Sequence, residues 1–402
     1  MPSTLNGSSV NQDRLREIIE HLEKIDRPSA SDGERVAAEW IAEQLRAEGA
    51  TVRVEEESAH GGYWWPLGIP SALGALAGAL VLKGFVRRIV GFAVGIFSAA
   101  AIYDDVSGGK LWFRRRFLKK RSTWNVVAEV GDPNAKETVV LIAHHDAAHS
   151  GIIFHPGIPE TLNKIAPSVL EKSETSPPML VPVFLAPLIV ALGSLLGIRK
   201  LTKLGAWMCA AGTGVFLDIA ARHVVPGAND NLSSVSLLVE LARLQREKPV
   251  EGLRVILLSV GAEESFMEGM KAFGERHFDD LPLETTRVIC LDGVGAPNLQ
   301  LIEGEGMILM KDYDVEFRDT IANLAADNGI RLGRGLRLSN ATDGLIPLKA
   351  GYTAALICAV TDLKQPTNYH WPNDDSRHVT YETIADATLL SDKVIRHLAS
   401  RA

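Results

Sequence analysis

The chain has 402 residues, of which 42 are Lys or Arg and 49 are Asp or Glu, so its formal net charge is -7. Hydrophobic residues make up 46% and charged residues 23%, a balance that excludes a largely disordered chain. The acidic balance argues against nucleic acid as a partner, because surfaces that bind nucleic acid are basic. Cys209, Cys290 and Cys358 are too few and too widely spaced for a disulfide framework or a cysteine-type zinc site.

The N-terminal part of the chain predicts two helices, over residues 11–25 and 33–48. It has no apolar run of the kind found in secretory signal peptides. In the first helix, apolar residues recur at helical spacing, from Leu15 to Ile25. Ser31 followed by Glu34 has the spacing of a capping box, in which each residue of the pair bonds to the backbone N–H of the other.

Further along, apolar and alternating runs predict strands that are separated by helices. The predicted strands begin at Thr51, Ser122, Glu137, Gly252, Arg287 and Tyr352. The predicted helices lie near Leu238, from about Val315 to Asn328, and from Tyr381 towards the C-terminus. This alternation predicts an α/β fold with a mixed, mostly parallel central sheet flanked by helices.

Two stretches, at about 63–103 and 179–221, are far more apolar than the rest. Each contains two uncharged segments of about 14 to 22 residues around a short basic connector. The connectors carry Lys83, Arg87 and Arg88 in the first stretch, and Arg199, Lys200 and Lys203 in the second. Spanning a bilayer takes about 20 apolar residues, so we expect two hydrophobic helical hairpins in contact with membrane lipid. A subunit interface in a homo-oligomer and burial inside the body are the alternatives.

These hairpins would divide the chain into a body and two insertions. We expect the body to consist of residues 1–62, 122–178 and 222–402. The first insertion is residues 63–121, which end in the basic run RRRFLKKR (114–121), and the second is residues 179–221. The basic run is either a solvated loop or a patch on anionic lipid. Together with the lack of a signal peptide, it favours the cytoplasmic side of a membrane for the body, although the basic connectors compete with it.

Acidic residues and histidines stand at the ends of several predicted strands or in the loops after them. The segments are AHHDA (143–147), PGANDNLSS (226–234), SVGAEES (259–265), LDGVG (291–295) and NYHWPNDD (368–375). Such loops form the binding crevice of α/β sheets. Each segment alone has a simpler explanation: Asp230 could cap a helix, and Glu263 and Glu264 could form an acidic first helical turn. Together, their nitrogen and oxygen ligands suit zinc, and the many carboxylates suit two metals that share one.

In this order, the five segments resemble the motifs of the di-zinc aminopeptidases, a family that includes secreted bacterial leucine aminopeptidases and plasma glutamate carboxypeptidases. The resemblance covers about residues 126–402, apart from the second hairpin. It implies a zinc exopeptidase-like fold and two Zn²⁺ ions, or other divalent transition metals. The implied metal ligands are His144 and Asp292 for one ion, Glu264 and His370 for the other, and Asp230 as the bridge.

The resemblance also implies the roles of residues around the metals. Glu263 would be the general base, and Asp146 would orient His144. Tyr369 matches a tyrosine that stabilises the oxyanion in some members, although a packing aromatic is the alternative. Thr342 and Asp343 resemble a loop that shapes the specificity pocket. His145, His149, His155 and His378 match no ligand position and are not expected to bind metal.

The resemblance implies a zinc-dependent exopeptidase, first of all an aminopeptidase that hydrolyses N-terminal residues of peptides with a metal-bridging water. The apolar hairpins predict that it is attached to a membrane. A related carboxypeptidase, amidohydrolase or cyclase is the alternative. So is a non-catalytic membrane scaffold that keeps a peptidase-like body. One departure is that the second hairpin stands between the segments that carry Asp146 and Asp230, so both hairpins could emerge beside the site.

Overall fold

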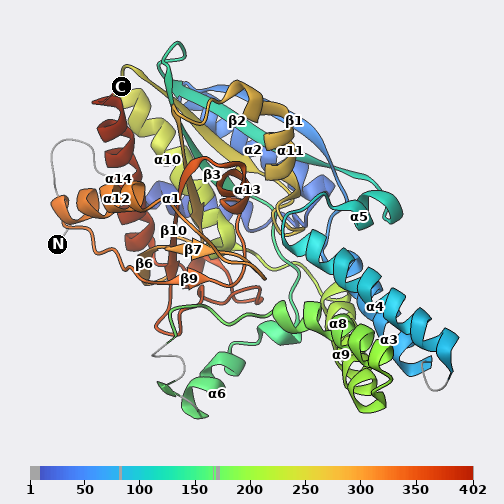
Figure 1. The fold of residues 1–402 in the computed structure, drawn as a ribbon. Coiled ribbons are helices and arrows are strands. Elements are labelled where there is room, and N and C mark those ends of the chain that lie inside the picture. Colours follow the sequence, from blue (N-terminus) through green and yellow to red (C-terminus); the bar gives the residue numbers. More distant parts are fainter. Residues whose placement is uncertain (1–9, 81–83, 166, 169–172, 402) are drawn as a thin grey trace.

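A seven-stranded sheet forms the centre of the body (Figure 1). The computed structural model describes residues 10–80, 84–165, 167–168 and 173–401. The strand order is β1-β2-β4-β3-β5-β10-β6. The strands are β1 (Thr51–Ala59), β2 (Arg121–Gly131), β3 (Glu137–His144), β4 (Leu253–Val260), β5 (Thr286–Asp292), β6 (Asn298–Leu301) and β10 (Thr353–Val360). The four central strands run parallel and the outer pairs antiparallel, so the predicted mixed α/β fold is confirmed.

Helices cover both faces of this sheet, because the side chains of the central strands alternate between two apolar layers. In β3, Leu141 belongs to one layer, whereas Val140 and Ile142 belong to the other. The helices on the first face are α1 (Gln12–Leu22), α2 (Asp32–Ala47), α10 (Ser233–Glu247), α12 (Val315–Asp327) and α14 (Tyr381–Ala399). The second face is covered by α11 (Glu268–His277) and α13 (Leu345–Ala350), and by the inner ends of the helices in the apolar stretches.

Shorter elements complete the body. A second, three-stranded sheet has the order β8-β7-β9. Its strands are β7 (Gly304–Glu305), β8 (Lys311–Asp312) and β9 (Arg337–Leu338). The short helices are α5 (Trp112–Phe117), α6 (Gly157–Ile165), η1 (Ile152–Phe154), η2 (Ala228–Leu232), η3 (Phe278–Asp280) and η4 (Ser376–His378).

The two apolar stretches form four helices that project together from one side of the body (Figure 1). They are α3 (Trp64–Leu80), α4 (Phe85–Val106), α8 (Val181–Leu196) and α9 (Arg199–Ala221), and we call them the helical arm. Helix α3 packs on α9, and α4 packs on α8, so the two hairpins are interleaved. Small residues allow this close packing: a Cβ added to Gly78 would lie 2.6 Å from the Cβ of Ala206.

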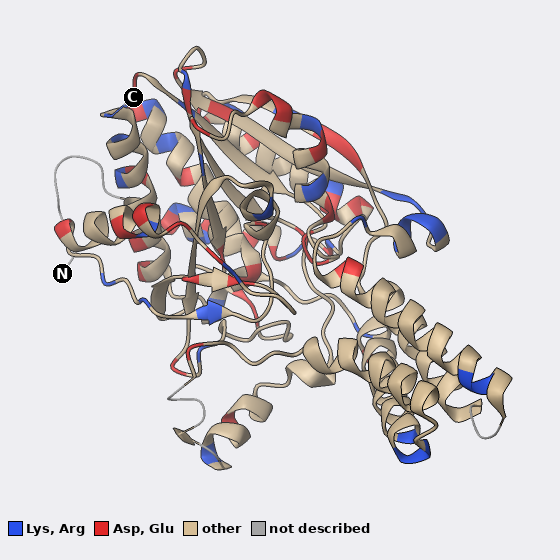
Figure 2. Cartoon of the chain, in the orientation of Figure 1, with Lys and Arg blue, Asp and Glu red and all other residues tan. Residues whose placement is uncertain are grey.

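The helices of the arm have no charged residues along most of their length and carry basic residues at their far end (Figure 2). Phe85 and Trp207 are 75% and 76% exposed. Arg87 and Arg88 lie in the first turn of α4, and Arg199 begins α9. Lys83 lies outside the described residues. Helices α4 and α9, of 22 and 23 residues, are long and apolar enough to cross a membrane by length and composition.

Two expectations for polar residues are corrected. Arg114 was expected in a solvated or lipid-facing basic run, but it is fully buried, because its guanidinium finds partners in Asp105, Glu268 and the carbonyl of Ser265. The capping box forms only in part. Ser31 Oγ accepts the N–H of Glu34, whereas the carboxylate of Glu34 turns into the body.

Inside the body, the buried carboxylate of Glu34 joins α2 to two other segments. Its oxygens accept hydrogen bonds from Ala30 N (2.7 Å), Thr123 Oγ1 (2.6 Å), Trp124 N (3.0 Å) and Ala262 N (3.1 Å). All four partners are donors, so an amide NH₂ at this position would face a donor and leave it unsatisfied.

We therefore expect Glu34→Gln to lower the free energy of unfolding by about 1–3 kcal/mol, because at least one buried donor loses its acceptor. Glu39→Gln is the control, since Glu39 lies on the same helix, is 53% exposed and pairs only with Arg35 among the described residues. That control should change stability by less than about 0.5 kcal/mol. Urea denaturation of the two variants measures the difference, and equal effects would contradict this role of Glu34.

Candidate metal centre

The five residues expected as metal ligands come together at the carboxyl ends of the parallel strands. His144 is the last residue of β3, and Asp292 is the last residue of β5. Glu264 follows β4, and His370 lies in the loop after β10. Asp230 lies in η2, just before α10. Parallel strands bring these loops to the same edge of the sheet, which explains why residues far apart in sequence meet here.

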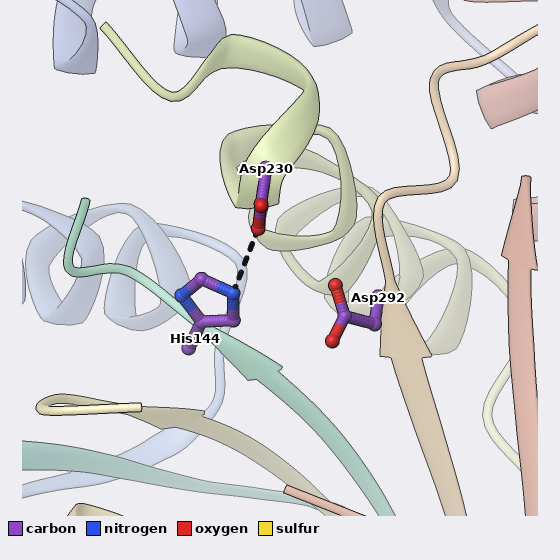
Figure 3. A group of neighbouring side chains, drawn as sticks. All are labelled: His144, Asp230 and Asp292. Carbon is purple, nitrogen blue, oxygen red and sulfur yellow. Dashed lines mark hydrogen bonds and ion pairs between the residues drawn. The ribbon is translucent and has the colours of Figure 1, made fainter. Parts of the chain in front are cut away.

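The carboxylate of Asp230 lies between the two histidines. Its Oδ1 is 3.1 Å from His144 Nε2, and its Oδ2 is 3.4 Å from His370 Nε2. Figure 3 shows the contact with His144, and shows the carboxylate of Asp292 at the end of β5 facing the same space. Each oxygen of one carboxylate thus faces a different imidazole, as in a carboxylate that bridges two cations.

Ligand atoms cluster in three overlapping groups, in each of which they lie within 4.8 Å of one another. The first group is His144, Asp230 and Asp292; the second is Asp230, Glu264 and His370; the third is His144, Glu263 and Glu264. The first two groups share Asp230. In the third, Glu263 Oε2 lies 4.0 Å from His144 Nε2. The cluster thus offers two sets of ligand atoms that share Asp230, with the carboxylate of Glu263 beside them.

The shifted pKa values of these groups indicate that their charges interact strongly. Burial lowers the pKa of His370, but Glu264 and Asp230 outweigh it and raise it to about 10. Burial, reinforced by the charge of Asp230, raises the pKa of Asp292 to about 7. Burial also raises the pKa of Glu264 above its usual range. The acidic groups therefore need positive charge to ionise together, and the two histidines supply it when no cation is bound.

Among the described residues, two polar atoms of the candidate ligands lack a hydrogen-bond partner. Glu264 Oε1 and His370 Nδ1 are buried and have no hydrogen-bond partner in the described part of the chain. Buried polar atoms are rarely left without a partner, so these two atoms indicate a missing ligand or water. Imidazole nitrogens and carboxylate oxygens without a thiolate are a ligand set that suits zinc.

Asp146 lies beneath this cluster and connects two of its parts. It is fully buried, and its Oδ1 lies 3.4 Å from His144 Nδ1. Its two oxygens also accept the backbone N–H groups of Glu263 and Glu264, both at 3.1 Å. Burial opposes ionisation, but hydrogen bonds to His144 and Ser29 outweigh it and lower the pKa of Asp146. Its position matches the orienting role that the family resemblance implies.

Three further polar residues support the site, and the sequence did not single them out for this. Buried Arg27 donates to the carbonyls of His145 (2.8 Å) and Gly227 (3.1 Å), so it joins the His144 segment to the Asp230 segment. Asp374 accepts the N–H groups of Asn229 (2.8 Å) and Asp230 (3.1 Å). Ser29 Oγ donates to Asp146 at 2.6 Å. Of these three residues, only Asp374 could have been found from the sequence, because it belongs to the acidic turn after Tyr369 and His370.

Aromatic rings surround His370. Tyr369 stacks on it with ring centroids 3.9 Å apart, and Phe154 packs against it edge-on at 4.6 Å. Burial raises the pKa of Tyr369 well above its usual value, so its hydroxyl stays protonated at neutral pH and can donate a hydrogen bond. Tyr63 directly precedes α3, and its ring stacks on that of Phe266. Phe266 lies two residues after Glu264. The base of the helical arm is therefore part of the surroundings of the site.

Asp343 also lies near the cluster. It is 1% exposed, and its Oδ1 has no hydrogen-bond partner among the described residues. Burial raises its pKa well above the usual range. Its neighbour Thr342 donates its N–H to buried Glu305 at 2.7 Å. The structure therefore places Asp343 close to the metal candidates, where the resemblance implies a loop of the specificity pocket.

The remaining histidines named above lie outside the three groups of candidate ligands. His145 Nδ1 lies 2.9 Å from Ser259 Oγ, His149 Nδ1 contacts the carbonyl of Arg222, and His378 pairs with Asp375. The ring of His155 packs on Trp371. Each has a local partner that explains its position.

Part of the chain matches a known protein family, and its fold resembles solved structures. The model of peptidase family M28 matches residues 213–394. No curated protein matches the sequence. Among solved structures, a Zn-dependent exopeptidase from Parabacteroides distasonis is similar, with 14% identity and a TM-score of 0.56 over 97% of this chain and 99% of that one.

Two other solved structures carry different activities in their names. An aminopeptidase from an Aneurinibacillus species has 14% identity and a TM-score of 0.56, covering 96% of this chain and 93% of that one. The glutaminyl cyclase of Bacteroides thetaiotaomicron has 14% identity and a TM-score of 0.57, covering 97% and 99%. At these identities, the likeness establishes the fold alone. Residues 213–394 thus match peptidase family M28, as the resemblance predicts for four of the five segments, and the chain has the fold of a solved zinc-dependent exopeptidase.

Proposed function

We propose that this protein is a membrane-attached, zinc-dependent aminopeptidase with two metal ions. The observation that carries the proposal is the Asp230 carboxylate, whose two oxygens face His144 and His370 at 3.1 and 3.4 Å. In this proposal, His144 and Asp292 hold one zinc, and Glu264 and His370 hold the other. Zinc at these positions supplies Lewis acidity, which polarises a peptide carbonyl and makes water a better nucleophile near neutral pH.

The proton in this reaction is carried by Glu263. Its carboxylate is 12% exposed and borders the cluster 4.0 Å from His144, without belonging to the two groups that share Asp230. Burial raises the pKa of Glu263 well above its usual value. A raised pKa makes the carboxylate of Glu263 a stronger base towards the attacking water, and the proton that it takes up then passes to the leaving amine.

Other side chains orient the reacting groups. Asp146 fixes the imidazole of His144 and, through the backbone N–H groups, the direction of Glu263. The Tyr369 hydroxyl remains protonated, so it can donate a hydrogen bond to the negative charge that develops on the carbonyl oxygen. Aromatic packing by Phe154 keeps the Tyr369–His370 segment in place.

Membrane attachment is proposed for the helical arm. At 1.5 Å per residue, the 22 residues of α4 extend about 33 Å. Its last turn packs in the body with Ile102 and Asp105, and the part before that turn comes close to a hydrocarbon core of about 30 Å. Exposed side chains such as Phe85 and Trp207 would leave large apolar patches in water. The alternative is that the arm forms a subunit interface, and fractionation of the full-length protein distinguishes the two. We keep the cytoplasmic side as the expected location of the body.

Cyclisation of N-terminal glutamine is the second candidate function, because three of the similar solved structures are glutaminyl cyclases. Both reactions act at the N-terminus of a peptide, but they release different products. An aminopeptidase releases a free amino acid, whereas the cyclase reaction releases ammonia. Peptides that begin with Leu, Ala or Gln, assayed for both products, distinguish the two functions.

We expect the purified protein to hold about two zinc ions per chain and to lose activity on chelation, because its carboxylates and histidines form two groups around Asp230. Asp230→Asn should lose most of the metal, since an amide offers one oxygen. Asp375→Asn is the control. Asp375 lies in the same loop as His370, but it pairs with Arg377 and His378 and belongs to none of the candidate ligand groups. Elemental analysis measures both. A metal-free protein that does not take up zinc would refute the proposal.

We expect Glu263 to be needed for catalytic turnover but not for zinc binding. We expect Glu263→Gln to keep its zinc and to lose about 10²–10⁴ in kcat, the usual range for a positioned acid or base. Glu264→Gln, one residue away, should instead lose zinc. Metal content and kcat of the two variants are compared directly. The opposite pattern would show that the two glutamates have exchanged roles.

The arm should be separable from the site only if its inner ends are kept. Leu67, Ile102 and Phe216 pack into the apolar layer under the sheet, so complete removal of the hairpins would open the body. We expect a protein that lacks residues 71–98 and 187–212, each replaced by a short Gly/Ser linker, to leave the membrane fraction and to keep its zinc. If the full-length protein remains in the aqueous phase without detergent, the arm is a subunit interface.

A further inference from the structure

The segment that carries Glu263 and Glu264 has a strained backbone. Ala262, Phe266 and Met267 have φ angles of 51°, 66° and 58°, in the left-handed region that residues other than glycine rarely adopt. Three such residues around two adjacent glutamates persist only where surrounding groups fix the backbone. We call residues 262–267 the glutamate loop.

On the side of the body, carboxylates fix the first half of this loop. Glu34 accepts the N–H of Ala262 at 3.1 Å, and Asp146 accepts the N–H groups of Glu263 and Glu264. These bonds end at Glu264. In the second half, the N–H of Met267 donates back to the carbonyl of Glu263 at 2.8 Å, and the carbonyl of Ser265 is held from outside the loop.

On the other side, the loop is bonded to the base of the helical arm through Arg114. This side chain is fully buried, and its Nη1 donates to the carbonyl of Ser265 at 2.6 Å. Its Nε donates to Asp105, in the last turn of α4, at 2.9 Å. It also pairs with Glu268 at 2.9 Å, and Glu268 in turn accepts the hydroxyl of Ser265.

Stability alone does not explain why a charged cluster is buried around Arg114. Buried ion pairs often add little to stability compared with apolar residues of similar size, because desolvation opposes them. What the planar guanidinium provides is a fixed geometry, since its fork contacts the arm and the loop at the same time. A second contact supports the connection, because Tyr63 at the start of the arm stacks on Phe266.

We propose that Arg114 is a positioning residue, which fixes Glu263 and Glu264 by fastening the glutamate loop to Asp105 at the base of the helical arm. The proposal rests on the proposed function, in which Glu264 binds metal and Glu263 moves the proton. It adds that the seating of the arm controls the geometry of the site.

The test is Arg114→Lys in the full-length protein, because lysine keeps the charge but loses the fork. We expect zinc to be retained, KM to change by less than about threefold, and kcat to fall about 10–100-fold, as for a misplacement of up to about 1 Å. The absorption spectrum of the cobalt(II)-loaded protein should shift, since Glu264 moves. Arg115→Lys is the matched control, because Arg115 is the next residue, is 47% exposed and pairs with Glu275.

A second variant separates positioning from stability. Leu15→Ala, in α1 on the other face of the sheet, removes buried apolar contacts far from Arg114, so it should lower Tm with kcat kept within about threefold. If Arg114→Lys does not fold, the double variant Asp105→Asn/Arg114→Gln, which leaves the net charge of the cluster unchanged, should show the same loss of kcat and the same spectral shift.

The outcomes distinguish this proposal from the proposed function. A wild-type protein that takes up no cobalt(II) refutes the metal site itself. A protein that takes up cobalt(II), with wild-type spectrum and kcat in Arg114→Lys or in the double variant, refutes the positioning role of Arg114. So does a loss of kcat that follows the loss of Tm equally in all variants.

Discussion

One buried carboxylate, that of Asp146, carries the connection on which the site depends. Its two oxygens contact the imidazole of His144, at the end of β3, and the backbone of Glu263 and Glu264, after β4. Because β3 and β4 are neighbouring parallel strands, an aspartate two residues after the end of one reaches the loop that follows the other. Its ionised form is favoured there, so the same charge orients a basic ligand and an acidic loop. The rest of the site is arranged around this short link between two strands.

Much of the body could be predicted from the sequence, because its strands and helices follow simple patterns. The apolar runs from Glu137, Gly252 and Arg287 form central strands, as expected for a sheet that is covered on both faces. The five segments with acids and histidines could be placed at one edge for the same reason, since parallel strands end together. The meeting of His144, Asp230 and His370 could therefore be predicted, although their distances could not.

The supporting residues could not be predicted, because their roles arise only from tertiary contacts. Arg27 and Glu34 lie near the N-terminus and touch loops more than a hundred residues away. In sequence, Glu34 has the spacing of a capping residue, and Arg114 belongs to a basic run, yet both side chains are buried. Local patterns describe what a residue can do beside its neighbours in sequence. They do not reveal which distant donor or acceptor will face it.

The interleaving of the arm has a consequence for how the chain is made. Helix α3 packs on α9, whose first residue is synthesised more than 110 residues after α3 ends, so the first hairpin must wait for its partner. At about 5–20 residues per second, the wait lasts roughly 6–25 seconds. During that time the segments with His144 and Asp146 emerge, while those with Asp230, Glu264 and His370 are still absent. A nascent chain therefore carries the whole helical arm before it carries a complete site, so a chain released at that point would be an inactive precursor.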